Sequence, residues 1–136
     1  MTRDAAPRSF DQPRGRVVPA SFTGVDRSGR PAVVDLGSPC LVLVVKPNCD
    51  GCRDALASDL QPLDGVAIVA VSPTAGAPGE WDSARVEVVV APEFLEALDV
   101  RFPPVYLLVD AARGRVLTEG VLFDAVQVAS EVAPYL

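Results

Sequence analysis

Short apolar runs alternate with segments of helical spacing along most of the chain. Leu41–Val45 and Val66–Val71 are apolar runs without polar alternation, which is typical of strands buried on both faces of a parallel sheet. Between them, apolar residues recur at steps of four, four and three from Cys52, a spacing that predicts a helix over Asn48–Gln61. Pro62 is expected to end that helix. This order of elements indicates an α/β fold.

The flanking segments predict further strands and two more helices. Ala20–Val25 and Pro31–Leu36 enclose a turn-rich stretch, and this arrangement predicts a β-hairpin. A loop rich in proline and glycine is expected over Ser72–Asp82. The remaining expected elements are a strand over Arg85–Val90, a helix over Glu93–Val100, strands over Val105–Val109 and Arg115–Thr118, and a terminal helix over Asp124–Val132. Together these elements predict an α/β three-layer sandwich with right-handed crossovers.

The length of 136 residues fits one domain, without an internal repeat. Residues 1–16 are polar and proline-containing, so we expect a flexible tail followed by a domain over residues 17–136. The tail lacks the apolar centre of a signal peptide, and no apolar run approaches the roughly 20 residues of a membrane span. We therefore expect a cytoplasmic protein without a membrane partner.

Charge and histidine content narrow the function classes. The net charge of −6 argues against a nucleic-acid partner, because such surfaces are basic. The chain contains no histidine, which excludes Ser–His and Cys–His nucleophile pairs and histidine zinc motifs. Two of the three cysteines, Cys49 and Cys52, lie close together. In a reducing compartment such a pair suggests redox chemistry and not a structural disulfide.

The tetrad Cys49-Asp50-Gly51-Cys52 is the strongest chemical signal. It stands where a buried strand gives way to a helix, and two cysteines on a first helical turn are within disulfide reach. A helix N-terminus offers unpaired N–H groups and the positive end of the dipole, which favour a thiolate. Cys49, nearer the helix tip, is expected to attack a disulfide, and Cys52 to resolve the mixed disulfide.

Other interpretations of the two cysteines stay open. They could be packing residues, or zinc ligands in a site shared between chains. A structural zinc needs four N or S ligands, and one chain supplies three cysteines and no histidine, so we expect no metal. Cys40 precedes the strand Leu41–Val45 and should lie at its opposite end, too far from the tetrad for a disulfide.

Several other side chains could affect the tetrad or its substrate. Lys46 could favour a thiolate or be a solvated charge at the end of a strand, whereas Asp50 opposes ionisation of the thiol. Arg53 is interpreted as a surface residue of the first helical turn. Trp81 could line a substrate groove, although a packing role over the edge of the core is preferred.

Two motifs resemble the thioredoxin superfamily, most closely its TlpA-like and MauD-like redoxin branch. The stretch Val44–Arg53, VVKPNCDGCR, is similar to the strand, loop and CxxC of that branch. Phe102–Asp110, FPPVYLLVD, is similar to its cis-proline and the following strand. The resemblance implies a thioredoxin-like sandwich with a central mixed sheet and an N-terminal hairpin extension. It also implies that Pro104 is the cis-proline and that Pro103 and Pro104 contact substrate beside the CxxC.

The sequence also departs from the thioredoxin pattern. Asn48 replaces the tryptophan before the first cysteine, and Asp50-Gly51 replaces Gly-Pro. Leu43 stands where thioredoxin keeps a buried aspartate that assists proton transfer. A peroxiredoxin would need proline seven residues before its cysteine, and the chain has Val42 and Val45 at those positions relative to Cys49 and Cys52.

The expected function is thiol–disulfide exchange without a cofactor. Its partners would be a protein or small-molecule disulfide substrate and a thiol-reducing system that recycles the cysteine pair. The contrasting hypothesis is a non-catalytic member of the same fold that acts as a binding or assembly module. The sequence leaves the substrate and the direction of electron flow open.

Overall fold

The structure is a computed structural model that describes residues 17–37, 39–100 and 103–136. The expected tail over residues 1–16 and Phe102 lie outside the described residues. The strands are β1 (Ser21–Val25), β2 (Pro31–Asp35), β3 (Cys40–Val44), β4 (Ala67–Ser72), β5 (Val88–Val90), β6 (Val105–Asp110) and β7 (Arg115–Val121). The helices are α1 (Asp50–Ala57), α2 (Pro92–Ala97) and α3 (Ala125–Val132), with short 3₁₀ turns at Gln61–Leu63 and Ala133–Tyr135.

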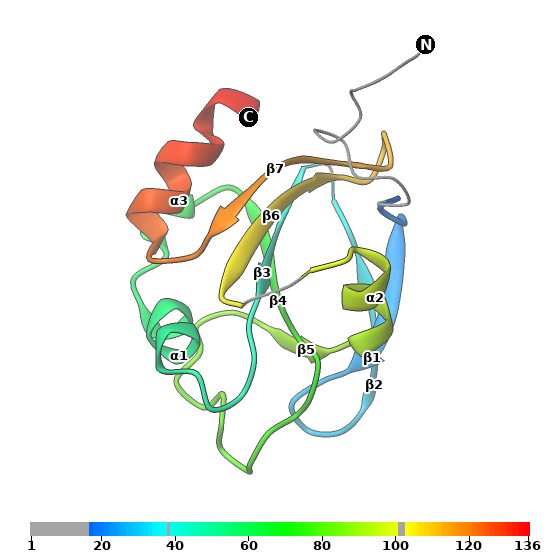
Figure 1. The fold of residues 1–136 in the computed structure, drawn as a ribbon, viewed down its shortest axis with the longest axis vertical. Coiled ribbons are helices and arrows are strands. Elements are labelled where there is room, and N and C mark those ends of the chain that lie inside the picture. Colours follow the sequence, from blue (N-terminus) through cyan, green and yellow to red (C-terminus); the bar gives the residue numbers. More distant parts are fainter. Residues whose placement is uncertain (1–16, 38, 101–102) are drawn as a thin grey trace.

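The strands form one mixed sheet in the order β2-β1-β5-β4-β3-β6-β7 (Figure 1). β4 pairs in parallel with both β3 and β5, whereas β6 runs antiparallel between β3 and β7. The antiparallel hairpin β1–β2 joins the sheet through Val25 and Val90. The expected mixed sheet with an N-terminal hairpin extension is therefore confirmed.

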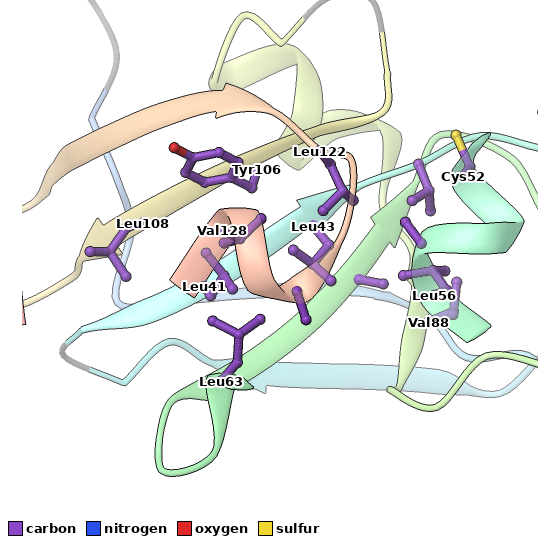
Figure 2. Packing of buried hydrophobic residues seen from close by; sticks show 14 of the residues in the cluster. Leu41, Leu43, Cys52, Leu56, Leu63, Val88, Tyr106, Leu108, Leu122 and Val128 are labelled. Carbon is purple, nitrogen blue, oxygen red and sulfur yellow. The ribbon is translucent and has the colours of Figure 1, made fainter. Parts of the chain in front are cut away.

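Helices cover both faces of the sheet, which makes three layers (Figure 1). On one face, residues of α1 and α3 pack in a cluster with Leu41 and Leu43 of β3 (Figure 2). On the other face, residues of α2 pack in a second cluster with Val42 and Val44. Every residue of β3 is buried. The unbroken apolar run thus marks the central strand, as the sequence pattern indicates.

Helix α1 is shorter than the expected Asn48–Gln61. It begins at Asp50 because Asn48 has a left-handed backbone (φ 59°) and Cys49 is extended. It ends at Ala57, where Ser58 leaves the helix and donates its hydroxyl to the Ala55 carbonyl at 2.7 Å. Local hydrogen bonds of this kind compete with the helix and are invisible to periodicity alone.

The last strand is longer than expected and runs on to Val121. Gly120 permits this, because a Cβ there would lie 2.9 Å from Cε2 of the buried Tyr106 ring on the neighbouring strand. The Tyr106 hydroxyl donates a 2.6 Å hydrogen bond to Glu131 of α3. Burial, with a contribution from Glu131, raises the pKa of Tyr106 to about 12. Tyr106 is thus a structural residue.

Cys40 is buried and free at the first residue of β3, whereas Cys49 follows the other end of that strand. This confirms the expected separation. Burial raises the pKa of the Cys40 thiol, which keeps it protonated and unreactive. None of the helices in the described part of the chain is long and apolar enough to cross a membrane.

Candidate active site at the CxxC

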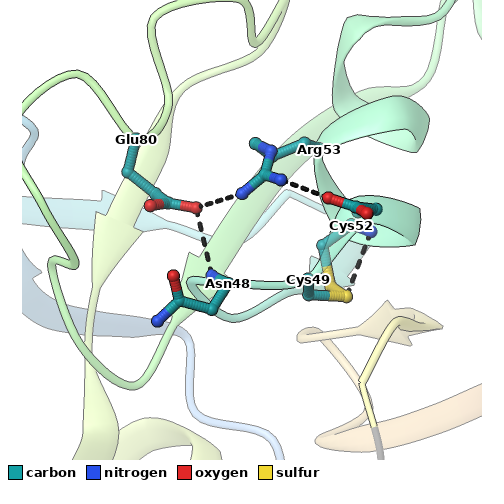
Figure 3. The surroundings of a disulfide bond; sticks show 6 residues. Asn48, Cys49, Cys52, Arg53 and Glu80 are labelled. Atoms are coloured by element: carbon teal, nitrogen blue, oxygen red, sulfur yellow. Dashed lines mark hydrogen bonds and ion pairs between the residues drawn. A yellow bond between two sulfur atoms is a disulfide. The ribbon is translucent and has the colours of Figure 1, made fainter.

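Cys49 and Cys52 form a disulfide at the N-terminus of α1, with 5.2 Å between their Cα atoms. Cys49 is the N-cap residue, and its Sγ accepts a 3.2 Å hydrogen bond from the Cys52 backbone N–H (Figure 3). Cys52 is buried, whereas Cys49 is partly exposed. The more accessible sulfur is therefore the one that the helix terminus can stabilise as an anion, as the spacing indicates.

The backbone before Cys49 shapes this arrangement. Asn48 adopts a positive φ, which asparagine tolerates better than most residues, and so turns the chain from β3 into α1. Its backbone N–H donates a 3.2 Å hydrogen bond to the Glu80 carboxylate. Asparagine thus has a structural reason to stand where thioredoxin has tryptophan.

The peptide bond between Pro103 and Pro104 is cis, as the resemblance implied. A Cβ at Gly51 would lie 3.8 Å from Cγ of Pro104, so the proline ring lies directly beside the first turn of α1. The Pro104 carbonyl accepts a 3.0 Å hydrogen bond from the Leu122 backbone N–H. The fold therefore brings Pro104, the CxxC and the connection after β7 to one edge of the sheet.

The interpretation of Arg53 as only a surface residue is incomplete. Its guanidinium pairs with Asp50 and donates a 2.9 Å hydrogen bond to Glu80 (Figure 3). The hydrogen bond to Glu80 raises the pKa of Arg53. Glu80 was not identified from the sequence, since it lies far from the tetrad along the chain. A solitary glutamate in a loop otherwise rich in glycine, alanine and proline was the signal available.

Trp81 is buried and packs in the cluster that contains Cys52, so the packing interpretation is confirmed. It also borders a cavity of about 300 Å³ with Arg27 and Glu80. Lys46 is exposed and, with Pro103, borders another cavity of about 340 Å³ on the α2 side of the sheet. Among the residues that the structure describes, no cluster of three or more His, Cys, Asp or Glu side chains could hold a metal ion.

No protein-family model and no curated protein sequence matches this chain. Solved structures are similar to it. The thioredoxin domain of a thiol-disulfide oxidoreductase from Bacteroides vulgatus has a TM-score of 0.63 and 21% identity, over 89% of this chain and 96% of that one. A thiol:disulfide interchange protein from Bacteroides sp. has a TM-score of 0.65 and 21% identity, over 89% and 88%.

A secreted Mycobacterium tuberculosis disulfide oxidoreductase, homologous to E. coli DsbE, has a TM-score of 0.63 and 18% identity, over 83% of this chain and 95% of that one. These likenesses span most of each structure. The chain therefore has the thioredoxin-like fold.

Proposed function

We propose that the protein is a thiol–disulfide oxidoreductase in which Cys49 attacks and Cys52 resolves. The observation that carries this proposal is the closed Cys49–Cys52 disulfide at the start of α1, with Pro104 beside it. The solved structures of the same fold named above support the proposal. A thioredoxin-like fold alone does not define an activity. The function is therefore inferred from the chemistry of the cysteine pair.

The exchange conserves electrons between the two disulfides. The Cys49 thiolate attacks one sulfur of a substrate disulfide, forms a mixed disulfide and releases the other sulfur as a thiolate, which takes up a proton. The Cys52 thiolate then attacks Cys49 Sγ, which frees the second substrate thiol and closes the Cys49–Cys52 disulfide. Two electrons pass to the substrate. An external thiol reductant must return them for another turnover.

The hydrogen bond from the Cys52 backbone N–H to Cys49 Sγ favours this order of events, because an anionic sulfur accepts such a bond more strongly than a neutral one. The buried position of Cys52 keeps a substrate from reaching it first. Its only accessible disulfide partner is then Cys49, which lies within bonding distance.

The surface beside Pro104 supports a polypeptide substrate. Val121, Phe123 and Val126 are exposed, and they follow one another from the end of β7 into the first turn of α3. The Leu122–Pro104 hydrogen bond holds this Phe123 patch next to the cis-proline. We propose that the patch binds apolar side chains that flank a substrate cysteine, while Pro103 and Pro104 offer backbone groups to the same peptide.

The Phe123 patch can be tested with the Phe123→Ser substitution. Phe123 is 70% exposed, so serine should leave the fold intact and remove only contact area. An exposed aromatic anchor contributes about 1 kcal/mol or more to binding, which corresponds to a rise of about fivefold or more in KM for a polypeptide disulfide. The reduction of bis(2-hydroxyethyl) disulfide, which is too small to reach the patch, should keep its rate.

Val33→Ser provides the control, since Val33 is also 70% exposed but lies on β2 at the far edge of the sheet. It should change neither rate. An equal loss with both substrates in Phe123→Ser would show that Phe123 supports the site itself and does not bind peptide.

The proposed function is tested by insulin reduction in the presence of dithiothreitol, followed by the turbidity of the released chains. The wild-type protein should shorten the lag before precipitation, and the Cys49→Ser, Cys52→Ser double variant should behave like dithiothreitol alone. A wild-type protein without any effect on insulin or on glutathione disulfide would favour the non-catalytic binding or assembly module instead. The expected cytoplasmic location stays a prediction, which fractionation of the native cells would test.

A further inference from the structure

A carboxylate outside the CxxC accepts hydrogen bonds from the residues that flank this motif in the sequence. Glu80 belongs to the loop between β4 and β5, and its side chain is only 7% exposed. Oε2 accepts hydrogen bonds from the Asn48 backbone N–H at 3.2 Å and from Arg53 Nη1 at 2.9 Å (Figure 3). One carboxylate oxygen therefore links the residue before Cys49 to the residue after Cys52.

The loop that carries Glu80 is held in place from two directions. A Cβ at Gly76 would lie 2.9 Å from the Pro47 ring, so the loop backbone packs closely on the segment that leads to Cys49. Arg27, in the turn between β1 and β2, donates a hydrogen bond to the Trp81 carbonyl, next to Glu80 in the chain. The N-terminal hairpin thus supports the position of the buried carboxylate.

Glu80 is one of several charged side chains around Cys49. Among the described residues, the charged side chains of the segments beside the tetrad include Lys46, Asp50, Arg53, Asp54, Glu80, Asp82, Arg85, Glu87 and Asp124. Arg53 is shared between two of these carboxylates, the exposed Asp50 and the buried Glu80. The hydrogen bond to Glu80 contributes most to the raised pKa of Arg53, and a buried charge is screened less by solvent than an exposed one, so Glu80 offsets the Arg53 cation.

We propose that Glu80 is a positioning and charge-setting residue that fixes the backbone of Asn48 and restrains the ionisation of Cys49 by neutralising Arg53. This inference rests on the proposed function, because it concerns the reactivity of the same cysteine. The residue that controls the Cys49 thiolate would then lie in a loop distant from Cys49 in the sequence. The buried aspartate of thioredoxin is replaced in this chain by Leu43 of β3.

The test measures alkylation of Cys49 by iodoacetamide in the fully reduced protein. The thiolate sulfur forms a bond to carbon and iodide leaves, so the rate reports the thiolate population, and peptide mass mapping separates Cys49 from Cys52. Glu80→Gln removes a negative charge with little change of shape and should raise the rate at pH 7 about threefold or more. Arg53→Gln removes the cation and should lower the rate by a similar factor.

The opposite signs distinguish charge from structure. If Glu80 only held the loop together, both substitutions would disorder the same contact and change the rate in the same direction, which would overturn the inference. If one single variant fails to fold, the double variant supplies the second measurement, because a lost contact would not return its rate toward that of the wild type. The Glu80→Gln, Arg53→Gln double variant restores the net charge and should return the rate to within about twofold of wild type.

Glu93→Gln is the matched control, because Glu93 is an exposed carboxylate of α2 on the other face of the sheet. Its rate should equal that of the wild type. Exchange with glutathione is measured in parallel. A wild-type protein that exchanges while Glu80→Gln and Arg53→Gln leave alkylation unchanged would overturn the Glu80 inference alone, whereas a wild type that never exchanges would overturn the proposed function.

Discussion

Replacing Cys49 by serine is expected to reduce disulfide exchange to the uncatalysed rate. A serine hydroxyl stays protonated near neutral pH and forms no disulfide, so the first step has no nucleophile. Cys52 cannot take its place, because its side chain is buried beneath the first turn of α1. The insulin assay and exchange with glutathione disulfide should both show the loss.

Cys52→Ser should behave differently and accumulate a mixed disulfide. Cys49 can still attack, but no second thiol lies within reach to release the substrate, since Cys40 is at the far end of β3. Non-reducing electrophoresis and mass mapping should find the substrate attached to Cys49. Cys40→Ala is the control and should retain the wild-type rate. Equal trapping by both single variants would contradict the assigned order of attack.

The sequence predicts the sheet and the redox pair well, because both depend on local patterns. The apolar run around Leu43 identifies the central strand, and the position of the CxxC between that strand and α1 identifies the site. The two ends of α1 are harder to predict. They depend on the backbone angle of Asn48 and on a hydrogen bond of Ser58, and neither feature alters the spacing of apolar residues.

The contacts around the CxxC could not be predicted in the same way. Arg53 looks like an ordinary solvated charge on a helix, and its role emerges only when a loop 27 residues away brings Glu80 against it. Trp81 shows the same limit, since one side chain both packs in the core and borders a cavity. Such contacts arise from tertiary structure, and a single sequence holds no periodic signal for them.

A large loss of stability is expected when Leu43, in the core cluster that supports the CxxC, is replaced. Leu43 is 1% exposed and lies between Ala70 of β4 and Tyr106 of β6 in the register of the sheet. It belongs to the cluster that includes Cys52 (Figure 2). Leu43→Ala should leave a cavity in this cluster and lower the free energy of unfolding by about 2–5 kcal/mol.

Urea denaturation of the oxidised protein measures this effect as a lower midpoint with an unchanged slope. Leu136→Ala provides the matched control, since that leucine is 59% exposed and should cost less than about 0.5 kcal/mol. Leu43→Met keeps the volume and should cost less than about 1.5 kcal/mol, with the exchange rate retained.

A tolerated Leu43→Ala would mean that β3 is not the packed centre of the sheet. A Leu43→Met variant that is stable but inactive would mean that Leu43 serves the chemistry of the cysteines as well as their support.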